Sequence, residues 1–219
     1  MSVDIRRASA RFIDRAAGRR TAHAFSFGSH FDADHVRFGP MVCHDDHLLR
    51  EGEGFDDHPH SGLAIVTWVV SGAVRHTDST GQVHTLVPGE VGLLRAGVGV
   101  AHSEVAAAPQ TRFVQVWLTD DSDIEPTYEV LPVAAAADGF AAVLSPVPGA
   151  TLWVADLSDG QTVSTPAAAL THVYVARGAL LRNSLAEPLH EGDAFLFTDE
   201  PSYDLTAGCP TQLLCWTFA

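Results

Sequence analysis

Short runs of β-branched, aromatic and other apolar residues recur along this chain, and turn residues separate one run from the next. Runs of this kind, bounded by turn residues, predict β-strands. Helical periodicity is nearly absent. The strands recur roughly every ten residues, which is typical of an all-β sandwich or barrel. In the first half of the chain the predicted strands are Ile65–Val70, Ala73–Asp78, Val83–Val87, Val91–Arg95, Val100–Val105 and Arg112–Leu118.

The second half of the chain repeats this pattern weakly. Three pairs of segments are alike: 67–74 with 173–180, 88–90 with 191–193, and 113–117 with 212–216. Chance similarity between β-rich segments is the alternative explanation. The repeat predicts two β-barrel domains that arose by duplication, residues 1–126 and 127–219, joined near Ile124-Glu125-Pro126. The run Ala134–Ala137 then lies early in the second domain, and we expect it to form a short helix.

Charge and composition narrow the classes of partner. The 219 residues include 13 Arg, no Lys and 27 acidic residues, for a formal net charge of −14. Nucleic acids and anionic membranes both require a basic surface, so the charge argues against either partner. The most apolar stretch, Leu63–Val74, is shorter than a membrane span, and no signal peptide is evident. The cysteines at 43, 209 and 215 form no CxxC motif. We therefore expect buried thiols in a reducing cytoplasm. We also expect the protein to be a monomer.

Two pairs of potential metal ligands stand at strand spacing. His58 and His60 flank Pro59, and His102 and Glu104 flank Ser103. Residues i and i+2 share a face of a strand, so the two members of each pair converge. If the two strands are neighbours, three imidazoles and one carboxylate meet inside one barrel. This donor set suits Fe(II), Ni(II), Cu(II), Mn(II) or Zn(II).

Histidine pairs also occur in solvated loops, and this chain has 12 His. The matching i, i+2 spacing of the second pair, and the glycines that precede both pairs, favour a metal site. The histidines of the region before His58 are expected to be solvated or to make plain polar contacts: His23, His30, His35, His44 and His47.

The ligand pairs lie within a recognisable pattern. Gly54-x₃-His58-x-His60 … Gly72, followed by Pro88-Gly89-Glu90 … Gly99-x₂-His102-x-Glu104, resembles the cupin motif pair. More narrowly, the stretch from Phe25 to Glu104 is similar to the pirin family. Further segments that carry this resemblance are Asp45-Asp46, Ile65-Val66-Thr67, His76-x-Asp78-Ser79 and Gln115-Val116-Trp117.

The resemblance implies a bicupin with one metal ion in the N-terminal barrel, held by His58, His60, His102 and Glu104. The family is associated with iron, so Fe(II) is the first expectation, with Ni, Cu, Mn and Zn as alternatives. Some members act as quercetin dioxygenases, and eukaryotic members are described as nuclear transcription cofactors. The leading hypothesis is a dioxygenase for a flavonol-like or other enolisable aromatic substrate and O₂. Glu104 would then be both a ligand and the general base.

Two other functions remain open: a metal-binding regulator whose redox state changes its affinity for a protein partner, and a structural bicupin that merely retains metal. The chain also departs from the pirin pattern, because Ser61 and Ala64 stand where Arg or Lys and then Glu are common. That difference leaves the four ligands intact but weakens any inference about a partner that binds this surface.

Other residues receive more ordinary interpretations. His76 lies two residues from Asp78 and could orient a metal ligand or line the pocket. An outward polar pair of His76 and Asp78 is the favoured expectation, and Asp45-Asp46 are expected to lie in a turn. Four aromatic residues offer rings that a substrate could stack on, but the core is the favoured expectation for them: Phe38, Trp68, Phe113 and Trp117. In the second domain, Ser164 and Pro166 occupy the positions of His58 and His60 when counted back from Gly178. We therefore expect no equivalent metal site there.

Overall fold

The computed structural model describes residues 1–133 and 139–219. The expected helix at Ala134–Ala137 lies outside the described residues. Within them every element is a β-strand except one short 3₁₀ helix, η1 (Ala8–Ala10), so the prediction of an all-β fold is confirmed. None of the described residues forms a helix with the length and apolar composition that crossing a bilayer requires.

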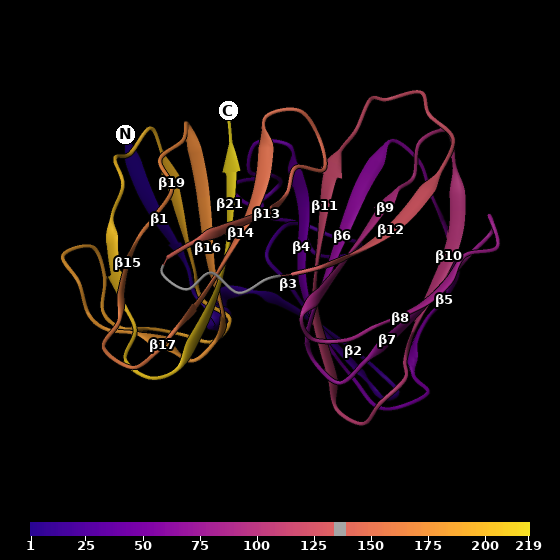
Figure 1. Ribbon diagram of the computed structural model, residues 1–219, viewed down its shortest axis with the longest axis horizontal. Helices are drawn as coiled ribbons and strands as arrows, with labels where there is room; N and C mark the ends of the chain where they lie inside the picture. Colours follow the sequence, from indigo (N-terminus) through magenta and orange to yellow (C-terminus); the bar gives the residue numbers. More distant parts are fainter. Residues whose placement is uncertain (134–138) are drawn as a thin grey trace. The chain divides into compact units, whose positions relative to one another are not determined.

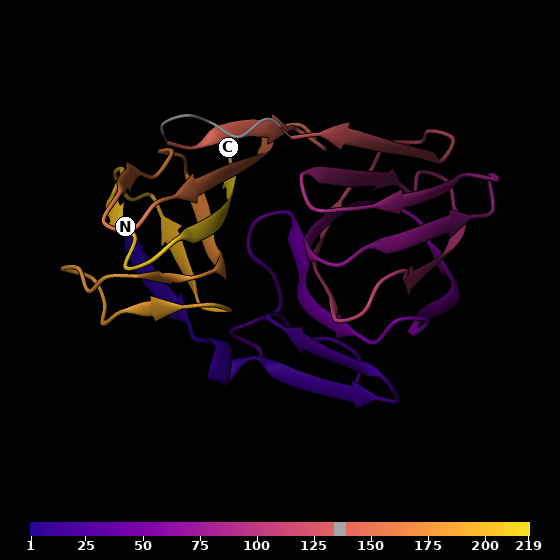
Figure 2. The same ribbon diagram turned by 60° about the horizontal axis from the view of Figure 1, so that its bottom comes forward.

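The chain divides into two units, which we call the N-terminal barrel (Phe12–Val133) and the C-terminal barrel (Met1–Arg11 with Ala134–Ala219). This division differs from the expected one at residue 126 in two ways. Strand β12 (Thr127–Pro132) pairs back onto the N-terminal barrel, and strand β1 (Ser2–Arg6) joins the C-terminal barrel. Figures 1 and 2 show β1, coloured indigo, among the yellow and orange strands. An alternating pattern identifies a strand but not the sheet that it joins, which explains the difference.

The N-terminal barrel consists of a seven-stranded and a four-stranded antiparallel sheet. The larger sheet has the order β12-β9-β6-β11-β4-β3-β2, and the smaller has the order β5-β10-β7-β8. Both sheets contribute to the core, where Phe113 and Val69 of the larger sheet pack with Val74 and Leu86 of the smaller. The remaining strands of this barrel are β2 (Phe12–Ala16), β3 (Arg19–His23), β4 (Met41–Leu49), β5 (Gly54–His60), β6 (Leu63–Ser71), β7 (Val74–Asp78), β8 (Val83–Leu86), β9 (Glu90–Arg95), β10 (Val100–Ala106) and β11 (Thr111–Thr119).

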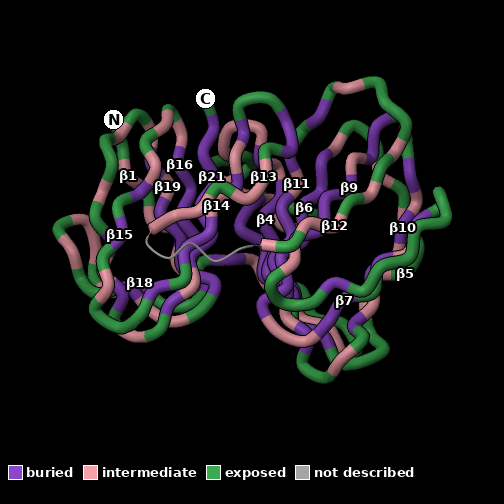
Figure 3. Tube along the Cα trace, viewed as in Figure 1, coloured by how far each residue is buried: buried purple, intermediate pink, exposed green. Residues whose placement is uncertain are grey.

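The C-terminal barrel has a six-stranded sheet of order β1-β19-β16-β21-β14-β13 and two small sheets, β15-β20 and β17-β18. Its core includes Val173, Phe195 and Leu213. Figure 3 shows buried residues along β16 and β21, as along β4 and β6 of the other barrel, and exposed residues in the turns. The strands are β13 (Ala141–Leu144), β14 (Ala150–Leu157), β15 (Thr162–Ser164), β16 (Leu170–Arg177), β17 (Ala179–Leu180), β18 (Leu189–His190), β19 (Ala194–Thr198), β20 (Asp204–Thr206) and β21 (Thr211–Phe218).

The large sheets of the two barrels share one strand order. The run β9-β6-β11-β4-β3 matches β19-β16-β21-β14-β13, and β12 and β1 occupy corresponding edges. The turn after the central strand is also the same. Gly72 and Gly178 have φ of 76° and 80°, and the following amide donates to Thr111 in one barrel and to Thr211 in the other, at 3.2 and 3.1 Å. These shared details support the predicted duplication.

The three cysteines all lie among the described residues, and they form no disulfide bond with one another. Cys43 and Cys215 are buried, as expected, whereas Cys209 is partly exposed. Burial raises the pKa of the Cys215 thiol, which keeps it protonated and unreactive at neutral pH.

Candidate metal centre

Strands β5 and β10 are hydrogen-bonded neighbours, and their register places His58 directly opposite His102. His60 lies opposite Val100, in the last residue pair of the ladder. A β-bulge interrupts the register between His102 and Glu104, so Glu104 lies opposite Phe55. Bulges of this kind redirect side chains and are common beside functional sites.

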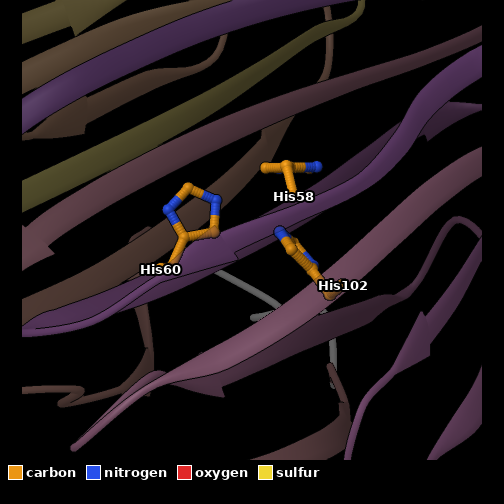
Figure 4. Close-up of side chains that lie close together, drawn as sticks. All are labelled: His58, His60 and His102. Atoms are coloured by element: carbon orange, nitrogen blue, oxygen red, sulfur yellow. The ribbon is translucent and has the colours of Figure 1, made fainter.

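Three histidine rings face one another at this point (Figure 4). Ring nitrogens of His58, His60 and His102 lie within 4.8 Å of one another. The His58 Nδ1 atom donates to the carbonyl oxygen of Asp56 at 2.7 Å, which leaves its Nε2 atom with a free lone pair. The Nε2 atoms of His60 and His102 are buried without a hydrogen-bond partner among the described residues. Three converging lone pairs, two of them unsatisfied and buried, are what a transition metal requires.

The protonation of these rings also suits a metal. Burial, together with the neighbouring imidazoles, lowers the pKa of His60 to about 4 and that of His102 to about 3. Both rings are therefore neutral at pH 7, and neutral imidazole is the form that binds metal ions.

Glu104 lies beside this cluster and is 3% exposed. A carboxylate oxygen of Glu104 lies within 4.8 Å of ring nitrogens of His102 and His76. The structure therefore forms two clusters that share His102: one of the three imidazoles, and one that contains Glu104 and His76. Thr67 Oγ1 donates to Glu104 Oε1 at 3.2 Å, and Gln115 Nε2 donates to Oε2 at 2.6 Å. These two donors fix the orientation of the Glu104 carboxylate.

The prediction of an outward His76–Asp78 pair is wrong. The two residues are 1% and 7% exposed, and His76 Nε2 lies 3.0 Å from Asp78 Oδ2. The alternation along β7 explains the error, because Val74 is fully buried and shares its face with residues 76 and 78. The apolar residue at position 74 is the sequence feature that indicates an inward direction for residues 76 and 78.

A cavity of about 400 Å³ adjoins the metal-site residues. His58, Glu104 and Gln115 line one part, and the aromatic rings of Phe55 and Trp117 line another. The Trp117 ring lies edge-on to His60 with 4.7 Å between ring centroids, and its Nε1 atom donates to Gln115 at 2.8 Å. Trp117 was expected in the core, and its place in the cavity wall is therefore a correction. Trp68 and Phe113 are buried as expected, at 4% and 0% exposure.

Polar residues of β3 and β4 also line the cavity. His23, Asp45 and His47 belong to these strands and are buried, whereas the sequence suggested loop and turn positions for them. His23 donates from both ring nitrogens, to Asp45 at 2.8 Å and to Asp14 at 3.2 Å. Burial alone would lower the pKa of His23, but these two carboxylates outweigh burial and raise it.

The other residues singled out from the sequence lie away from the cavity. Asp46 is a buried strand residue that pairs with Arg112 at 2.7 Å, so the expected turn at residues 45 and 46 is wrong. His44 is a buried residue of β4. His30 and His35 make the expected polar contacts, with Asp14 and Asp32. Ala64 is fully buried in β6, where an acidic residue would be without solvent.

The corresponding place in the C-terminal barrel has different chemistry. Ser164 of β15 lies opposite Asp204 of β20, and its hydroxyl donates to the Asp204 carboxylate at 2.6 Å. Both residues are exposed. The histidine-containing clusters that the described residues form both lie in the N-terminal barrel.

Two antiparallel barrels with one repeated strand order, and histidines that converge inside the first, define a bicupin. The family model described as Pirin matches residues 5–118. A Mycobacterium tuberculosis protein named "Putative quercetin 2,3-dioxygenase" is 36% identical over 98% of this chain and 94% of its own. The bacterial pirin YhhW of Escherichia coli, solved in complex with nickel(II), has a TM-score of 0.88 and 25% identity over 99% of both chains. The chain belongs to the pirin family.

Proposed function

We propose that this protein is a metal-dependent dioxygenase that acts on a flavonol-like or other enolisable aromatic substrate. The observation that carries the proposal is the cluster of His58, His60 and His102 beside a cavity of about 400 Å³. The Nε2 atoms of His60 and His102 in this cluster are buried without a hydrogen-bond partner among the described residues. Among its relatives, the quercetin 2,3-dioxygenase of Escherichia coli is 33% identical over 57% of this chain and 54% of its own.

In this proposal His58, His60, His102 and Glu104 hold one divalent transition metal. Three neutral nitrogen donors and one carboxylate suit Fe(II), which we favour, and equally Ni(II), which the YhhW complex contains. A metal ion in this site supplies Lewis acidity toward the substrate hydroxyl and redox chemistry toward O₂.

Glu104 is the base in this proposal. Its carboxylate lines the cavity, where it can take the proton of an aromatic hydroxyl. The hydrogen bonds from Thr67 and Gln115 use one lone pair of each carboxylate oxygen, so further lone pairs remain for a metal ion and a proton. Gln115 is itself held by Trp117, which keeps the base in one orientation.

The cavity wall fits a flat, polar aromatic molecule. Phe55 and Trp117 offer ring surfaces, and the Arg19 guanidinium lies 4.2 Å from the centroid of the Phe55 ring. His47, at the β3–β4 side, contacts Thr21 through its Nδ1 atom, so its other ring nitrogen can bond an additional hydroxyl. Apolar walls with a few placed polar groups are the usual composition of small-molecule sites.

The test compares the wild type with Glu104→Gln and Glu104→His at equal metal content, following quercetin loss and O₂ uptake together. Both substitutions remove the base, so we expect turnover to fall by about 10²-fold or more. Glu129→Gln is the matched control, because Glu129 is an exposed residue of β12. Wild-type rates in both fully metallated variants would show that Glu104 is not the base. A wild type that is inactive with iron, nickel, copper and manganese would refute the dioxygenase for quercetin and favour the metal-binding regulator.

A further inference from the structure

His76 and Asp78 lie on β7, on the other side of β10 from the strand that carries His58 and His60. In the β7–β10 ladder, Asp78 lies opposite His102 and His76 lies opposite Glu104. Both side chains are almost completely buried, and the proposed reaction assigns neither of them a role. Two buried polar residues directly behind two proposed ligands require an explanation, because burial of polar groups is costly unless they are satisfied.

The hydrogen bonds around Asp78 establish which atoms donate. Asp78 Oδ1 accepts from the Thr80 amide at 2.9 Å, the Thr80 hydroxyl at 2.6 Å and the Gln82 amide at 3.2 Å. A carboxylate so surrounded by donors is ionised and is purely an acceptor. The 3.0 Å contact from Asp78 Oδ2 to His76 Nε2 therefore has the proton on His76.

This proton determines the state of the next ring. A neutral imidazole that is protonated on Nε2 has its lone pair on Nδ1. The Nδ1 atom of His76 lies 3.4 Å from the Nδ1 atom of His102, so a neutral His76 accepts in this long contact and His102 donates. His102 then has its own lone pair on Nε2, the buried atom that has no hydrogen-bond partner among the described residues.

Tyr128 of β12 holds the His76 ring, which lies between Asp78 and His102, in place. Its ring stacks on His76 with 3.7 Å between centroids and an interplanar angle of 3°. Rotation of the His76 ring out of this stack would break both of its hydrogen bonds, so the stacking maintains the orientation on which the proton arrangement depends.

We infer that His76 and Asp78 are positioning residues of the metal site, which fix His102 in the Nδ1–H tautomer and thereby aim its Nε2 lone pair at the metal. His58 obtains the same tautomer from a backbone carbonyl, that of Asp56. His102 differs because its hydrogen bonds lead through His76 to the Asp78 carboxylate, which makes the His102 imidazole the more basic ligand. The inference rests on the ligand set of the proposed function, though not on its substrate.

Zinc(II) is the probe for the test, and competition with a chelator measures its dissociation constant. His76→Leu removes the acceptor for His102, and Asp78→Asn removes the anchoring charge, so we expect each to weaken zinc binding by about 10- to 100-fold. His76→Asn retains an oxygen near the Nδ1 position and should recover part of the loss. His84→Leu is the matched control, because His84 lies opposite His76 on β8, is exposed, and is also near the Tyr128 ring, at 5.4 Å.

A second measurement does not depend on any variant folding. Nitrogen-15 spectra of the zinc-loaded wild type should show His102 protonated on Nδ1 and His76 protonated on Nε2. The inference is overturned by the opposite tautomer of His102, by a His76→Leu protein with wild-type zinc affinity, or by a wild type that does not bind zinc. Neither readout involves turnover, so inactivity toward quercetin would refute the proposed function and leave this inference intact.

Discussion

Corresponding pairs of strands in the two barrels carry different side chains. Strands β5 and β10 pair His58 with His102, whereas β15 and β20 pair Ser164 with Asp204. The histidines are left with nitrogen lone pairs that could bind a metal ion, but the serine and aspartate satisfy each other with one hydrogen bond of 2.6 Å. Both barrels nevertheless keep the same glycine–threonine turn and the same sheet order. The framework therefore does not depend on the ligands.

The support behind the ligands differs as well. In the N-terminal barrel, β7 has five residues and carries His76 and Asp78. Its counterpart β17 has only two residues, Ala179 and Leu180. The C-terminal barrel thus differs both at the ligand positions and in the strand that orients them. This comparison indicates that a metal site needs a second layer of residues that hold the ligands, in addition to the ligands themselves.

Removal of one proposed ligand should have the largest effect. In His60→Ala we expect metal affinity to fall by more than the roughly 10- to 100-fold that is typical of a residue outside the ligand set. The metal-free protein should still fold, because His60 is partly exposed at the rim of the barrel. Plasma emission gives the metal content and circular dichroism gives the fold. The counterpart substitution Ser164→Ala should retain all the metal, and full occupancy in His60→Ala would refute the assignment.

The shared turn should be equally important to both barrels. A Cβ atom at residue 72 would lie 2.4 Å from Thr111 Oγ1, and one at residue 178 would lie 2.4 Å from the Pro210 carbonyl oxygen. We expect Gly72→Ala and Gly178→Ala each to lower the free energy of unfolding by about 1–3 kcal/mol or more, measured in urea.

Gly81→Ala separates strain from steric clash, because Gly81 has φ of 91° with nothing within 4 Å of the added atom. Gly81→Ala should lower the free energy of unfolding only by the cost of placing alanine at a positive φ. Equal losses at all three glycines would show that the close packing against the threonine strand contributes nothing.

Acid should destabilise both barrels of the metal-free protein. Burial lowers the pKa of His60 to about 4 and the pKa values of His102 and His172 to about 3, whereas the unfolded chain titrates near 6.5. Between these values the unfolded state binds more protons, so stability should fall as the pH falls from 6.5 toward 4.

Urea unfolding of metal-free protein at several pH values measures this loss. His172→Phe removes one titrating group from the C-terminal barrel only, so it should reduce the dependence on pH without altering the metal site. An unchanged pH profile in His172→Phe would contradict a contribution from the second barrel.

The smallest effect is expected from transplanting the ligands. Ser164→His, Pro166→His and Asp204→His together place three imidazoles at the corresponding positions of the C-terminal barrel. We expect the metal content to stay at that of the wild type, because these positions are solvent-accessible and lack a strand like β7 behind them. Elemental analysis with and without the His60→Ala background distinguishes the two sites. A second bound metal ion would show that ligands alone are sufficient.

Much of this architecture was predictable from local pattern. A short run of β-branched and aromatic residues predicted the strand Ile65–Val70, which the structure extends to Leu63–Ser71. The i, i+2 spacing predicted that His58 and His60 would share a face. The duplication was visible because turns and apolar runs recur in both halves. These features depend on neighbouring residues in the sequence, which is why they can be read without a structure.

Two features could not be predicted in this way. The exchange of edge strands, with β12 in the first barrel and β1 in the second, depends on pairings between distant segments. The burial of His23 and Asp45 contradicts the usual reading of polar residues as loop and turn residues. A barrel that contains a polar cavity reverses that reading locally, because its inward side chains include hydrogen-bonded charges.

The pairing of β1 with β19 has a consequence for how the protein is made. Ser2 pairs with Thr198, and Arg7 forms an ion pair with Asp193 at 2.8 Å. During translation the first strand therefore leaves the ribosome long before its partner is synthesised, while the strands of the N-terminal barrel can pair as they emerge. The barrel with the metal site is completed first, and the opening strand of the chain waits until nearly the end. An obstruction at the amino terminus, such as a bulky tag, should therefore impair the barrel that is finished last.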